Sequence, residues 1–433
     1  MLESIMHSIR LFFAQWALIA PLRIRNYRLL LVGSVISYIG ANLTFVAFPW
    51  LVLRLTNDPM AIGSVLAVAG IPRALFMLVG GVATDRYSPK TVMIWSTFLR
   101  LLLMAIMSSL VFTDAITVEL IFILAFFFGL LDAFFWPASS AILPSLVDKE
   151  LLPSSNALLQ GSGQMSLMLG PVLAGLIISA MGDGQGGEMT GIAFVFFLDV
   201  IGFTVSLITL FLIQSVPKAE PVDALDLRSL TNSLIEGFSA LWQDVPVRLM
   251  TLMVAIFTLF FRGPYMVGIP ILADARFEEG ALAFGLISSA FGVGALIGIL
   301  CAGSLPKLNE KWYGTLLLLD MLVLGSMFFV FAIAQHLELA MAVTVIGGLF
   351  DGYMVVLVIA WMQARIPENL IGRVMSFFMF FNNGLVPVSA AVAGWAIALS
   401  LEGTFFGVGG ILVTLCIVGL LIPKVRRLGM SPT

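Results

Sequence analysis

Hydrophobic residues along this chain gather in long runs that short polar segments separate. Runs of about 20 apolar residues, enough to cross a bilayer, recur throughout. Each run is expected to be a helix, because a helix satisfies its own backbone hydrogen bonds in lipid. A β-barrel strand would alternate apolar and polar residues, and residues 120–131 do not. The pattern predicts an all-α membrane protein with twelve spans: 29–53, 60–83, 91–112, 117–146, 155–181, 190–215, 248–273, 281–305, 314–335, 339–363, 371–399 and 403–423.

Composition supports the same class. Hydrophobic residues make up 60% of the chain and charged residues 11%, against roughly 25% charged residues in soluble proteins. Lys and Arg set the orientation: with both termini in the cytoplasm, seventeen lie in cytoplasmic segments, and the outer loops hold two, Arg54 and Arg276. We therefore expect an integral protein of a bacterial inner membrane with cytoplasmic termini. The net charge of −3 gives no indication of a nucleic-acid partner.

The two halves of the chain repeat one another. Ala61-Ile-Gly63 aligns with Ala283-Phe-Gly285, and the Gly-Leu-x-Asp segment that ends at Asp132 aligns with the one that ends at Asp351. Parallel repeats of this kind place a binding site between the halves, near the bilayer midplane. We therefore expect two pseudo-symmetric six-helix bundles that rock around a central site. The expected divisions are an amphipathic cytoplasmic N-terminus (1–28), an N-terminal bundle (29–215), a cytoplasmic linker (216–247), a C-terminal bundle (248–423) and a cytoplasmic tail (424–433).

Two segments outside the spans have apolar residues at helical spacing. Within the linker, Leu230 to Trp242 predicts a helix at the membrane interface. Near the N-terminus an apolar stripe predicts a second surface helix, through Ile5, Ile9, Phe12 and Phe13.

The loop after the second span reads Gly81-Val-Ala-Thr-Asp85-Arg86-Tyr-Ser-Pro-Lys90. It resembles the signature loop of the major facilitator superfamily, whose members carry small molecules by alternating access. The resemblance implies that Gly81 allows close helix approach and that Asp85, with Arg86 and Lys90, forms a conformational latch at helix ends. An alternative is that these charges serve as a topological anchor. The C-terminal copy keeps a glycine but has Lys307 where Asp85 stands.

The fifth span contains Ser166-Leu-Met-Leu-Gly170-Pro171-Val-Leu-Ala174-Gly175. This stretch resembles the antiporter motif of the same superfamily, with two glycines replaced by small residues. The resemblance implies export, through a bend at Pro171 and close packing at Gly170 and Gly175. Ordinary small-residue packing is the alternative. Four prolines inside spans are candidate kinks: Pro137, Pro171, Pro264 and Pro387.

Further stretches resemble the drug-exporter branch that includes macrolide and enterobactin exporters. They are Arg25-Asn-Tyr-Arg28, Phe48-Pro-Trp-Leu51, Pro72-Arg73 and the segment from Gly129 to Pro137. The arginine that many drug/proton antiporters carry in the fourth span is missing here. Proton coupling through that arginine therefore cannot be transferred to this chain.

Seven ionisable residues stand out inside spans: Arg73, Arg100, Asp132, Asp199, Arg262, Asp320 and Asp351. Such residues are costly in lipid and usually mark a pathway or an ion pair. The superfamily's arrangement implies that Asp132, Asp351 and Arg262 lie on cavity helices, where a buried aspartate can bind a proton reversibly. Arg73 is a candidate for the same cavity, although we interpret Arg73 and Arg100 mainly as structural partners of aspartates. Asp199 and Asp320 are interpreted as packing or interfacial residues.

Polar and aromatic residues complete the candidate cavity: Asn42, Trp136, Tyr265, Asn382 and Asn383. A few charges among Phe, Trp and Met suit a large amphipathic molecule. The chain has no nucleotide-binding Gly-x-x-x-x-Gly-Lys loop, two scattered histidines, and two cysteines that we interpret as packing residues. We expect no enzymatic activity, no cofactor and no metal site.

The combined prediction is a monomeric secondary active transporter surrounded by membrane lipids. It exports an amphipathic, drug-like or siderophore-like small molecule in exchange for protons. Two alternatives remain open: a transporter for uptake or for flipping a lysophospholipid, and a membrane sensor that does not transport.

Overall fold

The structure is a computed structural model that describes residues 19–182, 184, 189–214, 227–304, 312–367 and 370–426. It contains twelve helices that are long and apolar enough to cross a membrane, which confirms the predicted number of spans. The helices of the first half are α2 (Arg25–Thr56), α3 (Pro59–Arg86), α4 (Pro89–Phe112), α5 (Val118–Ile142), α6 (Leu152–Met181) and α7 (Thr190–Leu212). Those of the second half are α9 (Val245–Arg276), α10 (Ala281–Ser304), α11 (Tyr313–Ile333), α12 (Leu337–Arg365), the pair α13 (Ile371–Asn383) and α14 (Val386–Leu399), and α15 (Leu401–Leu421).

Local sequence explains where the helices begin. The turn between α2 and α3 places Asn57 in the left-handed region, Asp58 accepts a hydrogen bond from the Met60 amide, and Pro59 occupies the first turn. Ser88 before α4 and Asp244 before α9 cap their helices in the same way. The short connections before α3 and α4 force these consecutive spans to run antiparallel.

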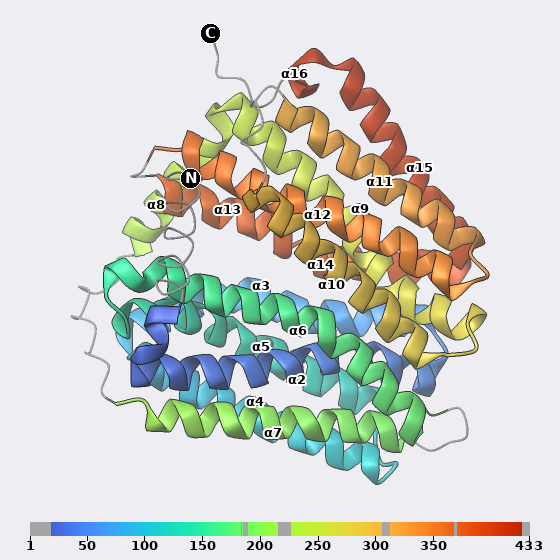
Figure 1. The fold of residues 1–433 in the computed structure, drawn as a ribbon, viewed down its shortest axis with the longest axis horizontal. Helices are drawn as coiled ribbons and strands as arrows, with labels where there is room; N and C mark the ends of the chain where they lie inside the picture. The colour runs from blue at the N-terminus through green and yellow to red at the C-terminus, as the bar shows by residue number, and fades with distance from the viewer. Residues whose placement is uncertain are drawn as a thin grey trace, which may run out of the picture.

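The helices form two bundles that lie against each other (Figure 1). Equivalent helices pack in both halves: α3 on α5 and α10 on α12, or α2 on α6 and α9 on α14. Between the bundles, α6 packs on α10 and α3 packs on α14. The twofold repeat in the sequence is therefore a repeat in the structure.

Contacts between the bundles concentrate away from the linker. We call the end where α2 and α9 begin the linker end, and the end where they finish the far end. At the far end, Arg54 Nη2 lies 2.6 Å from Asp274 Oδ1, which ties α2 to α9. Nearer the middle, the Val172 amide donates to Ser289 Oγ at 2.9 Å. The bundles are thus joined from the far end to the middle of the molecule.

The eleventh predicted span is broken into two helices. α13 ends at Asn383, and α14 begins at Val386 with Pro387 in its first turn. Because proline lacks an amide hydrogen, it breaks the continuous hydrogen-bond ladder there. The predicted kink at Pro387 is confirmed as a full break.

The linker contains a helix, α8 (Leu227–Gln243), as predicted. It packs on α13 through Phe238 and Phe377, with ring centroids 5.7 Å apart, and through an ion pair between Glu236 and Arg373. Ile235 and Trp242 are exposed, which leaves an apolar face available to a membrane surface. The predicted N-terminal stripe, from Ile5 to Phe13, lies outside the described residues.

Candidate functional site

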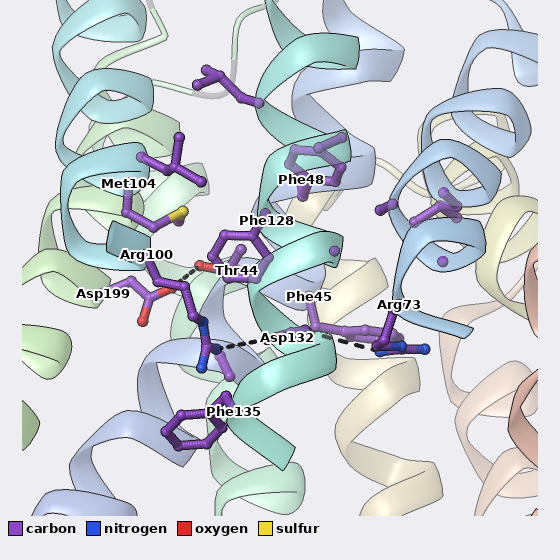
Figure 2. A pocket seen from close by; sticks show the side chains of 18 of the residues that line it. Thr44, Phe45, Phe48, Arg73, Arg100, Met104, Phe128, Asp132, Phe135 and Asp199 are labelled. Carbon is purple, nitrogen blue, oxygen red and sulfur yellow. Dashed lines mark hydrogen bonds and ion pairs between the residues drawn. The ribbon is translucent and has the colours of Figure 1, made fainter. Parts of the chain in front are cut away.

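The middle of the N-terminal bundle holds four charged side chains from four helices. Arg100 on α4 reaches Asp132 on α5, with Nη2 3.2 Å from Oδ1. Arg73 on α3 approaches the other oxygen of Asp132, at 4.0 Å (Figure 2). Asp199 on α7 completes the group. One aspartate therefore lies between two arginines, and the four charges balance.

Arg100 is buried among aromatic rings. Its guanidinium carbon lies 5.0 Å from the ring centroid of Phe128 and 4.7 Å from those of Phe135 and Phe203. Rings of this kind attract a cation through their negative faces, most strongly where water is excluded. The Nε and Nη1 atoms of Arg100 have no hydrogen-bond partner among the described residues. Its stability in this position therefore depends on Asp132 and on the rings.

Asp199 is fully buried where α7 crosses α2. Thr44 Oγ1 donates a hydrogen bond to Asp199 Oδ2 at 2.7 Å. Gly40 lies against the same carboxylate, and a side chain at that position would collide with it. The prediction that Asp199 is a packing residue agrees with these contacts, although Asp199 also reaches the cavity wall.

A cavity of about 340 Å³ opens beside these charges. Its wall is mostly apolar and aromatic, and most of it belongs to the N-terminal bundle, with Met266, Val386 and Pro387 from the C-terminal bundle. Arg73 is 39% exposed and is the most accessible of the four charged side chains. The aromatic residues of the wall are Tyr38, Phe45, Phe48, Phe128, Phe135 and Trp136.

The structure brings together only part of the predicted cavity. Arg73, Asp132 and Trp136 line it. Asn42 instead packs against Gly170 and donates to the Tyr38 carbonyl oxygen at 2.9 Å. Asn42 therefore lies at the contact between α2 and α6 in this conformation, and its place in the cavity wall stays a prediction.

The remaining predicted cavity residues belong to the C-terminal bundle and do not line this cavity. Tyr265 is buried within 5.6 Å of Phe261, centroid to centroid, and Asp351 is 8% exposed. Thr258 donates to the backbone oxygen of Asn382 at 3.3 Å, where α9 meets the break between α13 and α14. Asn383 donates within its own helix, to the Met379 carbonyl oxygen. Arg262 interacts electrostatically with Asp351.

The predicted latch lies at the linker end of α3. Lys90 Nζ donates to the Ile213 carbonyl oxygen at 2.5 Å, which gives a hydrogen-bond partner to a carbonyl group at the C-terminal end of α7. Arg86 lies 6.0 Å from the Tyr87 ring centroid. A methyl group on Gly81 would meet no described atom within 4 Å, so the close helix approach expected at Gly81 stays a prediction. The neighbouring Gly80 instead packs on the backbone of α5 at Ala133.

The antiporter-type motif lies at the contact between the bundles. A Cβ on Gly175 would lie 2.7 Å from the Ala281 carbonyl oxygen and 2.9 Å from Leu282 Cα, both on α10. Gly170 makes a similar approach to α2. The small residues of the motif therefore allow α6 to touch helices of both bundles.

Sequence reasoning did not identify the aromatic surroundings of Arg100 or the position of Asp199 beside them. Opposite charges on adjacent spans were a usable signal for the pair between Arg100 and Asp132. The contact between Thr44 and Asp199 joins residues far apart in the chain, so helical spacing carried no sign of it.

Comparisons with known proteins agree with this architecture. Residues 30–391 match the Major Facilitator Superfamily. The chain is 26% identical to the multidrug efflux pump Tap of Mycolicibacterium fortuitum, covering 93% of this chain and 97% of that protein. It is 22% identical to macrolide efflux protein A of Streptococcus pyogenes (92% and 96% covered). It is 24% identical to the enterobactin exporter EntS of Shigella boydii serotype 18 (94% of each).

Solved structures share the fold. The inward-facing bacterial homologue of the iron transporter ferroportin superposes with a TM-score of 0.70 at 14% identity, covering 91% of this chain and 98% of that one. The nucleoside transporter NupG gives a TM-score of 0.69 at 12% identity, with the same coverage of both chains. The match over residues 30–391 and the twelve-helix architecture lead to one conclusion: the chain belongs to the Major Facilitator Superfamily of membrane transporters.

Proposed function

We propose that this transporter exports an amphipathic, drug-like or siderophore-like small molecule in exchange for protons. The observation that carries the proposal is the cavity. Aromatic rings and methionines line it, and Arg73 supplies one accessible positive charge. A large apolar surface with few polar contacts suits molecules that are mostly hydrophobic and carry an isolated polar group.

The distribution of positive charges supports the direction. If the linker end faces the cytoplasm, as the excess of Lys and Arg there favours, the joined far end faces outward. The cavity is then accessible from the cytoplasm or the inner leaflet, where an exporter collects its substrate. The curated relatives named above are a drug pump, a macrolide efflux protein and a siderophore exporter, which supports export.

The test is transport by purified protein in vesicles. With a pH gradient imposed and no ATP present, we expect accumulation of an anionic amphipathic dye, a macrolide or a siderophore against its own gradient. Collapse of the pH gradient with a protonophore should abolish that accumulation. Movement that follows the substrate gradient alone would exclude proton exchange, and movement of lysophospholipid alone would favour the flippase alternative. Binding without movement under any gradient would overturn the proposal.

Trp136 offers a specific test of the cavity. It is 45% exposed, and it lines the cavity beside the charged group. Trp136→Ala should raise the half-saturating substrate concentration about fivefold, because an aromatic contact contributes about 1 kcal/mol.

The matched control is Trp95→Ala. Trp95 is 61% exposed on α4 and is not part of the cavity wall. It should leave the half-saturating concentration unchanged. Equal effects of the two substitutions on transport would remove Trp136 from the binding surface.

A further inference from the structure

The two bundles carry charged residues at equivalent positions, but the signs differ. Asp132 and Asp351 are 219 residues apart, and Arg100 and Asp320 are 220 apart. The first pair lies on α5 and α12, and the second on α4 and α11, which are equivalent helices of the repeat. Where the N-terminal bundle pairs an arginine with an aspartate, the C-terminal bundle has two aspartates.

Helix packing brings those two aspartates together. A side chain on Gly347 of α12 would meet Leu324 and Met327 of α11. These helices are antiparallel. One turn closer to the linker end than this contact, α12 carries Asp351 and α11 carries Asp320. The carboxyl groups of Asp320 and Asp351 interact electrostatically, as this register requires. The pair therefore crosses the contact between α11 and α12.

The positive charge near this pair is insufficient to balance it. Among the described residues, Arg262 on α9 interacts electrostatically with both carboxyl groups. Helices α10 and α14 carry no acidic or basic residue, and the acid of α15, Glu402, pairs with Arg276 at the far end. On α16 (Pro423–Arg426), Arg426 lies beside Gly314, which is six residues or about 9 Å along α11 from Asp320. The other titratable groups on these helices are either neutral residues, Tyr265, Cys301, Tyr313, Tyr353 and Cys416, or charged residues near helix ends, Arg248, Asp274, Glu338, Arg365 and Lys424.

The pair is also buried and incompletely bonded. Asp320 is 3% exposed and Asp351 is 8% exposed. Oδ1 of Asp320 and the hydroxyl of Tyr265 have no hydrogen-bond partner among the described residues. Two carboxylates beside one arginine leave one negative charge uncompensated at a buried position, which strongly favours the uptake of a cation. In the N-terminal bundle, two arginines already balance two aspartates.

We propose that Asp320 and Asp351 together bind one proton and form the ion-coupling site of this transporter. The proton joins one carboxylate oxygen, and the resulting hydroxyl donates to the other carboxylate, which keeps its negative charge under the electrostatic influence of Arg262. The pair thus takes up and releases its proton as α11, α12 and α9 change their packing between conformers. The claim that the pair binds a proton is independent of the proposed function, whereas the claim that it couples protons to transport rests on that function.

Infrared spectroscopy of purified full-length protein with isotopically labelled aspartate tests proton binding without any substrate. At neutral pH the carbonyl stretching band of protonated aspartic acid should lose the amplitude of one carboxyl group in Asp320→Asn and in Asp351→Asn. Asp114→Asn is the matched control, because Asp114 is an exposed aspartate in a loop, and it should lose nothing. Arg262→Gln should add the amplitude of one further carboxyl group, since both aspartates then need a proton.

Several results would overturn the proposal. They are an unchanged band in both asparagine variants, a band that sodium ions abolish, or an unchanged band in Arg262→Gln. The infrared band of Arg262→Gln tests proton binding by the pair even if the asparagine variants do not fold. In vesicles, Asp320→Asn should still move substrate down its gradient but should no longer respond to a pH gradient. If the wild-type protein moves no compound, the proposed function fails while the infrared result remains valid.

Discussion

Arg100→Leu is expected to lower the free energy of unfolding by about 3–5 kcal/mol, the usual cost of removing one partner of a buried ion pair. Arg100 is 6% exposed, and its nearest acidic partner, Asp132, lies between it and Arg73. Without Arg100, two aspartates share the one positive charge of Arg73. The three aromatic rings around the guanidinium lose their cation as well.

The loss should depend on pH. In Arg100→Leu the N-terminal bundle has the same charge balance as the C-terminal bundle, with two carboxyl groups for one arginine. The folded variant then binds a proton that the unfolded chain, near neutral pH, does not hold. Because the folded state binds more protons, the stability of the variant should fall as pH rises. Unfolding in mixed detergent micelles, followed at several pH values, measures this dependence.

Two further variants separate charge from packing. Asp132→Asn combined with Arg100→Leu restores one arginine to one aspartate, so it should recover part of the lost stability. Arg373→Met removes an exposed ion pair with Glu236, and it should change stability by less than about 1 kcal/mol. An Arg100→Leu protein as stable as the wild type at every pH would contradict the assigned role of Arg100.

Hydropathy was sufficient to predict the twelve spans, because the cost of exposing polar groups to lipid acts on each segment separately. It did not predict that the eleventh span divides at residues 384–385. Proline at 387 indicated a distortion, but the extent of the break depends on α9, where Ser389 Oγ accepts from the Gly263 amide at 2.8 Å. Such contacts join residues 126 positions apart, and local pattern carries no information about them.

The site was predictable to a smaller degree. Intramembrane charge drew attention to Arg73 and Asp132, which line the cavity, since a charge in lipid needs a partner or water. The choice of partner depends on how α4, α5 and α7 rotate against each other. The same limit applies to Asn42, whose side chain lies against Gly170 in this conformation. Repeat symmetry suggested equal roles for Asp132 and Asp351, yet one has two arginine neighbours and the other faces Asp320.

Gly175→Leu is expected to abolish most transport while leaving the protein folded. At this position α6 touches the backbone of α10, and a Cβ would lie 2.7 Å from the Ala281 carbonyl oxygen and 2.9 Å from Leu282 Cα. Backbone atoms cannot move aside as a flexible side chain does, so the bundles must separate at the far end. Overpacking of this kind costs about 1–3 kcal/mol, which shifts a two-state equilibrium roughly 5- to 150-fold away from the conformer described here.

Distances between spin labels on the two bundles measure that shift. Labels at Met60→Cys and Leu399→Cys, both exposed near the far end, should lie further apart in Gly175→Leu than in the parent protein. The parent protein would lack Cys301 and Cys416. Gly407→Leu is the matched control, because a side chain there meets no described atom within 4 Å, and it should change neither distance nor transport. An unchanged label distance in Gly175→Leu would mean that α6 and α10 can remain closed over a leucine, and the close backbone contact would then have no part in selecting the conformer.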